Sequence, residues 1–171
     1  MSLHGDLLEQ ALHLSSRERK KPKQASLRRA ISSAYYALFH LLLEEGAKQF
    51  ASDQGLRKLV RRAFVHGEMK KAAKSLSSGG TLPDHVKAVY LGTVPSELRN
   101  VAKAFVELQD RRHDADYDMN ASFTRAQVTD LITLAQDAFD DWKAVRAKPG
   151  ERVAVELFLS AMLLWDRWGK S

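Results

Sequence analysis

The strongest helix signal in the chain, and the one that decides its fold class, lies in residues 27–43, which read LRRAISSAYYALFHLLL. Apolar residues recur there at spacings of three and four, which places them on one face of an α helix. Pro22 suits the first turn of this helix, because proline lacks the N–H that is unpaired there, and Gly46 is a plausible end. The apolar face consists of Leu27, Ala30, Ile31, Ala34, Leu38, Leu41 and Leu42.

Helical periodicity extends over the rest of the chain, and strand signals are nearly absent. Thr124 and Gln127 form a capping box that starts one helix, with Phe123 placed to contact Val128. Ser96 is a reasonable N-cap of another helix, and the Ser-Gly stretch 77–80 resembles a flexible break. We expect helices from about 3 into residues 16–20, over 22–46, 54–65, 67–76 and 83–90, from 96 to an end within 111–119, and over 125–147 and 151–168.

These elements predict an all-α fold, an up-and-down helical bundle of four to five main helices with an extra C-terminal helix. We assign residues 1–147 to the bundle. Residues 148–171 form an amphipathic helix that packs on the bundle or on a partner.

The composition excludes several classes of site. The chain has 171 residues and no cysteine, which excludes disulfides, thiol nucleophiles and thiolate metal sites. Its six histidines do not pair at the i, i+4 spacing of a helical metal site, so we predict neither a metal nor a cofactor. There is no apolar run of ~20 residues and no signal-peptide pattern, so we expect a cytoplasmic protein with no membrane partner.

The net charge of +6 is concentrated in two segments. Residues 17–29 carry seven basic residues against one glutamate, and residues 57–74 carry the same numbers. Such patches fit contact with a polyanion such as nucleic acid, or they are solvated helix faces next to a basic loop. Neither segment interleaves aromatic residues that would stack on bases.

Two groups of polar residues are candidate sites. Arg29, Ser33, Tyr36 and His40 form one polar stripe on the 27–43 helix, which is either a structural hydrogen-bond network or part of a site.

The second group lies in residues 110–118, which read DRRHDADYD. Arg112 lies two turns after Phe105 and continues a buried stripe, so its guanidinium needs a partner such as Asp114 or Asp116. The group is either a salt-bridge cluster at a helix end or an arginine held to bind a phosphate. In the second interpretation Tyr117 or His113 serves as hydrogen-bond donor or general acid–base.

The segment LRRAISSAYYALFHLLL resembles the signature helix of the HEPN superfamily, and residues 107–139, ELQDRRHDADYDMNASFTRAQVTDLITLAQDAF, resemble its second signature. The resemblance covers roughly residues 6–145. It implies a bundle of four or five helices that is often a symmetric dimer. Ribonuclease members of the family cleave RNA without metal, using an arginine followed four to six residues later by a histidine. Such members are often toxins paired with a nucleotidyltransferase-like antitoxin, or act in anti-phage defence.

Carried over to this chain, the resemblance places Arg112 at the arginine position and Tyr117 at the histidine position. Tyrosine, with a pKa of ~10 against ~6.5 for histidine, is poorly matched to acid–base catalysis near neutral pH. Arg61 and His66 repeat the spacing in a segment that does not match the family's site.

We therefore expect a homodimer that binds RNA or nucleotide phosphate without being an efficient nuclease. One alternative is a metal-independent ribonuclease toxin. Another is a non-catalytic interaction module whose last helix docks on a partner through Phe158, Met162, Trp165 and Trp168.

Overall fold

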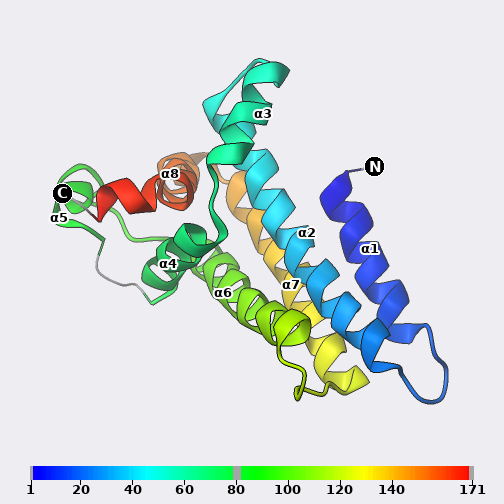
Figure 1. Cartoon of the computed structure of the whole chain (residues 1–171). Helices are drawn as coiled ribbons and strands as arrows, with labels where there is room; N and C mark the ends of the chain where they lie inside the picture. The colour runs from blue at the N-terminus through cyan, green and yellow to red at the C-terminus, as the bar shows by residue number, and fades with distance from the viewer. Residues whose placement is uncertain (1, 79–81, 170–171) are drawn as a thin grey trace. The chain divides into compact units, whose positions relative to one another are not determined.

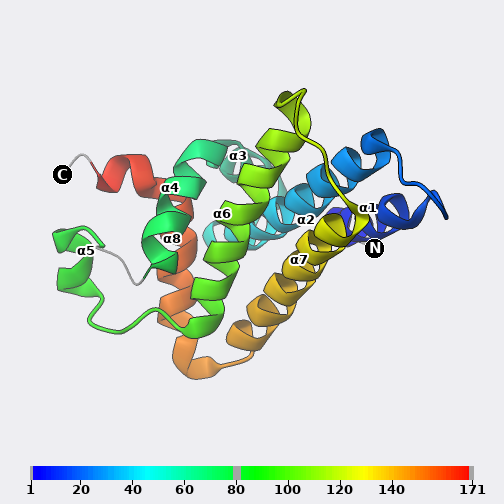
Figure 2. The same cartoon turned by 90° about the horizontal axis from the view of Figure 1, so that it is seen from below.

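The computed structural model describes residues 2–78 and 82–169 (Figures 1 and 2). Over these residues the chain forms α helices and one short 3-10 helix, with no strand, so the prediction of an all-α fold is confirmed. None of these helices is both long and apolar enough to cross a membrane. The predicted break at 77–80 falls partly outside the described residues. The elements are α1 (Leu3–Ser16), α2 (Gln24–Phe50), α3 (Gln54–Ala63), α4 (His66–Ser77), α5 (Asp84–Val89), α6 (Ser96–Tyr117), α7 (Arg125–Arg146), η1 (Pro149–Glu151) and α8 (Arg152–Trp168).

The residues predicted to start or end helices at Pro22, Ser96 and Gly46 have other positions in the structure. Pro22 lies before α2 and not in its first turn. The helix begins at Gln24, and the Leu27 amide donates to the Lys23 carbonyl. Ser96 is the first residue of α6 and not its N-cap. The Arg99 amide donates to the Pro95 carbonyl, so the first turn of the helix already includes Ser96. The largest difference is at Gly46, which lies inside α2 rather than at its end. A Cβ there would lie 2.4 Å from the ring of Phe64, so glycine serves close packing and not termination.

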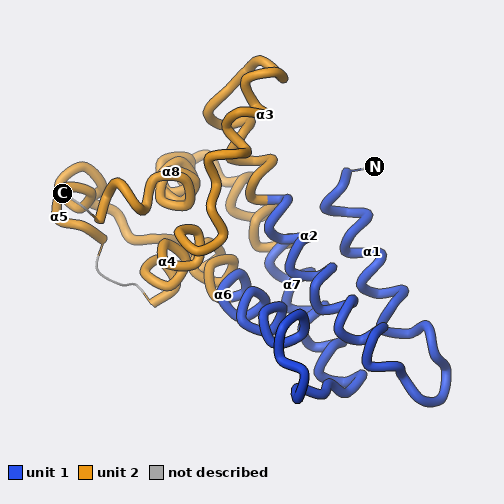
Figure 3. Tube along the Cα trace, viewed as in Figure 1, with its two compact units in different colours: residues 1–41, 104–139 blue, residues 42–103, 140–171 orange. Residues whose placement is uncertain are grey.

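The chain divides into two compact units, coloured in Figure 3. Unit 1 comprises residues 1–41 and 104–139, and unit 2 comprises residues 42–103 and 140–171. Helices α2, α6 and α7 each contribute residues to both units. The predicted domain boundary after residue 147 stays a prediction.

Unit 1 is built around the first half of α2. Residues 30–35 of this helix are all buried, including both serines, so α2 is surrounded on every side. Polar side chains buried in such a helix need partners, and the hydroxyls of both serines donate hydrogen bonds. Each fully buried Leu, Ile or Phe side chain contributes ~1.5–3 kcal/mol. Large core residues of unit 1 are Leu27, Ile31, Tyr35, Leu38, Phe105, Leu108 and Ile132.

In unit 2, α8 packs against α4. Met69 and Leu76 of α4 are buried, as are Phe158 and Met162 of α8. The ring of Trp142 lies 5.9 Å from that of Phe158. The apolar face of the C-terminal helix is therefore covered by its own chain.

The start of α7 shows the capping box that the sequence predicts. The Gln127 amide donates to the Thr124 hydroxyl at 3.2 Å, and the Thr124 amide donates to the Gln127 side-chain oxygen at 2.9 Å. Just before this cap, Gln24 exchanges two hydrogen bonds, of 2.8 and 2.9 Å, with the backbone of Phe123. The amide side chain thereby ties the start of α7 to the start of α2.

We predict that Thr124→Ala lowers the free energy of unfolding by about 1 kcal/mol, because it leaves an amide of the first turn without its acceptor. Thr129→Ala in the same helix is the matched control: its hydroxyl bonds only to the Arg125 carbonyl, and its side chain is exposed. We expect a change within ~0.5 kcal/mol for the control. Urea unfolding followed by circular dichroism measures both. Equal losses in the two variants would contradict the role assigned to the cap.

Candidate functional site

The site is centred on Arg112, in the penultimate turn of α6. Its Nη2 donates a hydrogen bond of 3.0 Å to the hydroxyl of Tyr36 on α2. Its Nε lies 2.7 Å from a carboxylate oxygen of Asp116, one turn further along α6. This contact is an ion pair and not an aligned hydrogen bond, since the Nε–H does not point at the carboxylate. The side chain is 19% exposed, so the arginine is mostly withdrawn from water and is paired, as predicted.

Asp116 is itself held by α2. Its second carboxylate oxygen accepts a hydrogen bond of 2.6 Å from the hydroxyl of Ser32. Two residues of α2, Ser32 and Tyr36, therefore fix both members of the ion pair. Because they are four residues apart, they lie one turn from each other on the same face of the helix.

Aromatic rings surround the guanidinium. Its carbon lies 5.4 Å from the ring centroid of Tyr36, 5.5 Å from that of Tyr117 and 5.9 Å from that of Tyr35. Contacts of this kind between a cation and the face of a ring are attractive and strengthen when water is excluded.

The electrostatics favour charged Arg112. Burial of the guanidinium lowers its pKa, but its neighbours Tyr36, Asp116, Tyr117 and Tyr35 together raise it, so the pKa lies above its ordinary value. Burial also raises the pKa of Tyr35 well above its usual range, although the nearby guanidinium opposes this change. Arg112 is therefore permanently cationic, and Tyr35 is a neutral phenol.

The outer part of the site is formed by Tyr117 and His113. Tyr117 is 63% exposed, and its ring lies 5.0 Å from the ring of His113 on the preceding turn. One face of α6 thus presents an exposed phenol in contact with both an imidazole and a guanidinium.

Arg28 supports the site, and the sequence interpretation did not single it out. Its guanidinium donates to the carbonyl of Ala115 at 2.8 Å and to that of Ala121. It also lies 5.7 Å from the ring of Phe123. Carbonyls at the end of a helix lack partners within the helix, and a cation that bonds them stabilises the end. The only sequence feature that points to this role of Arg28 is its place in an adjacent pair of arginines, Arg28 and Arg29.

The four residues of the predicted polar stripe on α2 do not form a single cluster. Tyr36 belongs to the Arg112 cluster, and the ring of His40 lies 6.3 Å from the Tyr36 ring. Ser33 instead donates to the side chain of Gln10 on α1, and Arg29 is exposed. Ser33 therefore ties two helices together, as the structural interpretation of the stripe predicts.

Asp114 also lies apart from the cluster. It pairs with Arg111 at 3.8 Å, with both side chains about half exposed. It therefore does not serve as the partner of Arg112, although the sequence left that role open between Asp114 and Asp116.

The basic loop before α2 is anchored to unit 1. Glu18 accepts hydrogen bonds from the Ser26 hydroxyl at 2.9 Å and from the Lys23 amide at 3.3 Å, which lower the pKa of its carboxyl. Arg125, in the first turn of α7, donates to the backbone carbonyls of Glu18 and Arg19. The exposed cations carried by this ordered loop are Arg17, Arg19, Lys20, Lys21 and Lys23.

Within residues 2–78 and 82–169, no group of three or more histidine, aspartate or glutamate side chains is arranged to hold a metal ion.

We predict that Asp116→Asn lowers the free energy of unfolding by about 1–2 kcal/mol, because a mostly buried guanidinium loses its counter-charge. Asp114→Asn removes the same charge from an exposed pair on the same helix, and we expect a loss below ~0.5 kcal/mol. In a chain that also carries Arg112→Met, Asp116→Asn should lower the free energy of unfolding by clearly less. Urea unfolding of the single and double variants measures this coupling, and additive losses would show that the pair does not stabilise the fold.

Comparisons of the chain with family models, with curated proteins and with solved structures found no match.

Proposed function

We propose that the chain is a HEPN-like helical domain that binds RNA through the cluster around Arg112 and Tyr117. The observation that carries the proposal is the exposed ring of Tyr117, which contacts both the Arg112 guanidinium and the His113 imidazole. An exposed tyrosine whose position is fixed by neighbours offers a face on which an unpaired base stacks.

The groups around Tyr117 can add charge and hydrogen bonds, which base stacking alone does not provide. Arg112 is a permanent cation with part of its surface exposed, and His113 can donate a hydrogen bond to a base or a phosphate. The basic loop 17–23 belongs to the same unit and is held in place by Arg125. Contacts from its lysines and arginines to phosphates make binding salt-dependent.

Binding without efficient cleavage is the form of the proposal that fits the side chains best. Tyr117 stands where a ribonuclease of this kind needs a histidine, and a phenol is a weak acid–base catalyst near neutral pH. Asp116 neutralises much of the Arg112 charge, which also weakens stabilisation of a transition-state phosphorane.

We predict that Tyr117→Ala weakens binding of a single-stranded RNA oligonucleotide by about 1–3 kcal/mol, or ~5- to 150-fold in Kd, whereas Tyr117→Phe retains most of the affinity. Met119→Ala, 90% exposed and two residues away, is the control and should leave the Kd unchanged. Fluorescence anisotropy at several salt concentrations measures all four proteins. The proposal fails if the unaltered chain does not bind RNA, or if Tyr117→Ala and Met119→Ala bind alike.

The ribonuclease alternative is favoured by one observation. His113 contacts the ring of Tyr117, which brings an imidazole into the same cluster as Arg112. In that case His113, and not Tyr117, would act as the acid–base group.

Under this alternative we predict that RNA cleavage continues in the presence of a chelator, is abolished by Arg112→Ala and falls at least 10-fold in His113→Asn. His113 is exposed, so its variant should keep the fold and separates catalysis from stability. A gel assay of labelled RNA with the purified variants gives the rates. Cleavage that survives in Arg112→Ala would place the nuclease site elsewhere.

A further inference from the structure

Helix α3 presents an apolar stripe that its own chain does not cover. Leu56, Leu59, Val60 and Ala63 occur at the i, i+3, i+4, i+7 positions, which form one face of a helix. No residue of α3 is buried, and Leu56 and Leu59 are 55% and 59% exposed. Val65, directly after the helix, is 55% exposed. Figure 1 shows α3 standing away from α4 and α8, which belong to the same unit.

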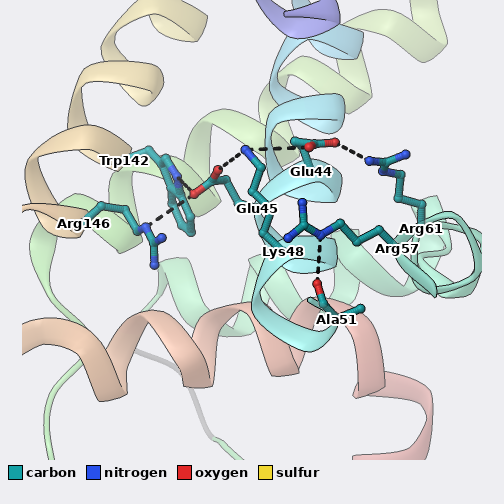
Figure 4. Close-up of polar contacts among 8 residues, drawn as sticks. All are labelled: Glu44, Glu45, Lys48, Ala51, Arg57, Arg61, Trp142 and Arg146. Atoms are coloured by element: carbon teal, nitrogen blue, oxygen red, sulfur yellow. Dashed lines mark hydrogen bonds and ion pairs between the residues drawn. The ribbon is translucent and has the colours of Figure 1, made fainter. Parts of the chain in front are cut away.

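The orientation of α3 is fixed by its other face (Figure 4). Arg61 forms an ion pair of 2.7 Å with Glu44, and Arg57 donates a hydrogen bond of 2.8 Å to the carbonyl of Ala51. Phe64, at the end of the helix, packs on Gly46 of α2. The apolar stripe is therefore exposed on an anchored helix and not on a loose one.

The charge of α3 limits what can cover this stripe. Its ten residues include Arg57, Lys58, Arg61 and Arg62 and no acidic residue. On a helical projection these four residues occupy both flanks of the stripe. Two α3 helices facing each other would repel, so the complementary surface needs an apolar floor and an acidic rim.

Unit 1 carries a groove with these properties, between the end of α6 and the start of α7. It has a volume of about 480 Å³, which is within the range of pockets that bind small groups. Phe123, Leu131 and Leu134 supply apolar lining, and Arg111 is the single cation among the lining residues. The acidic residues that line it are Glu107, Asp114, Asp118 and Asp130.

The groove and the Arg112 cluster use different faces of α6. Glu107, Arg111, Asp114 and Asp118 follow spacings of four, three and four, and so form one stripe. Arg112 lies about 100° around the helix from Arg111. A partner in the groove therefore does not have to displace Tyr36 or Ser32 from the ion pair.

We propose that α3 of one copy of this chain docks in the acidic groove of a second copy. The leucines of the stripe pack on the apolar floor, in the manner of helix-in-groove recognition. Lys58 and Arg62, both exposed, lie against the carboxylates of the rim. This contact is separate from the RNA-binding proposal and does not depend on it.

A charge-swap experiment tests the contact. The helix variant Lys58→Glu/Arg62→Glu and the groove variant Glu107→Lys/Asp130→Lys each place like charges across the contact, so each alone should self-associate at least 10-fold more weakly than the unaltered chain. Mixing the two should restore association, because the acidic helix then faces a basic groove and the other pairing is unaltered. Sedimentation equilibrium over a range of concentrations gives the association constants.

Two further variants serve as controls. Lys103→Glu/Lys143→Glu reverses two charges elsewhere on exposed helix positions, and it should self-associate like the unaltered chain. Leu56→Ser/Leu59→Ser leaves the charges in place, and it should weaken association as strongly as the helix variant. Circular dichroism checks that every variant is folded.

Three results would overturn the proposal. One is an unaltered chain that sediments as a monomer at every concentration. Another is a mixture of folded helix and groove variants that associates no better than either alone. The third is binding of the monomeric chain to anionic phospholipid vesicles that Leu56→Ser/Leu59→Ser abolishes, which would assign the stripe to a lipid surface.

Discussion

A guanidinium that is four-fifths withdrawn from water constrains the arrangement of unit 1. Arg112 continues a buried helix face, and an unpaired charge in that position would be unfavourable by several kcal/mol. The chain meets this requirement with one carboxylate from the same helix, a phenol from α2 and three aromatic rings. Ser32 then fixes the carboxylate, so the ion pair is one of the contacts that set the register of α2 against the end of α6.

Several contacts besides the ion pair hold the end of α6. Arg28 donates a hydrogen bond to the Ala115 carbonyl near its end, and Gln24 ties the residue before α7 to α2. The polar residues of this end fall on two faces, one with the Arg112 cluster and one with the acidic groove. The cationic, aromatic face and the acidic face can therefore bind two different partners, so the RNA-binding proposal and the self-association proposal concern different surfaces.

Sequence reasoning was most successful where the signal is local. The capping box at Thr124 and Gln127 depends on residues three apart, and it is present as predicted. It was wrong at Gly46, because a glycine that allows a ring from another segment to approach looks the same in sequence as one that ends a helix. At the site, a partner for Arg112 was predicted from its place on a buried stripe, but the roles of Arg28 and Ser32 depend on contacts 84–93 residues apart.

The sequence by itself determined that the chain is all-α, where most of the helices lie and that Arg112 must be paired. Periodicity, capping and the free energy of burying a charge act on neighbouring residues or on single side chains, so they are readable without coordinates. Only the tertiary structure decided that Asp116 and not Asp114 is the partner, that Tyr36 and Ser33 serve different contacts, and that α3 leaves its leucines exposed. Those outcomes depend on which helix faces meet, and this is set by the packing of segments far apart in the chain.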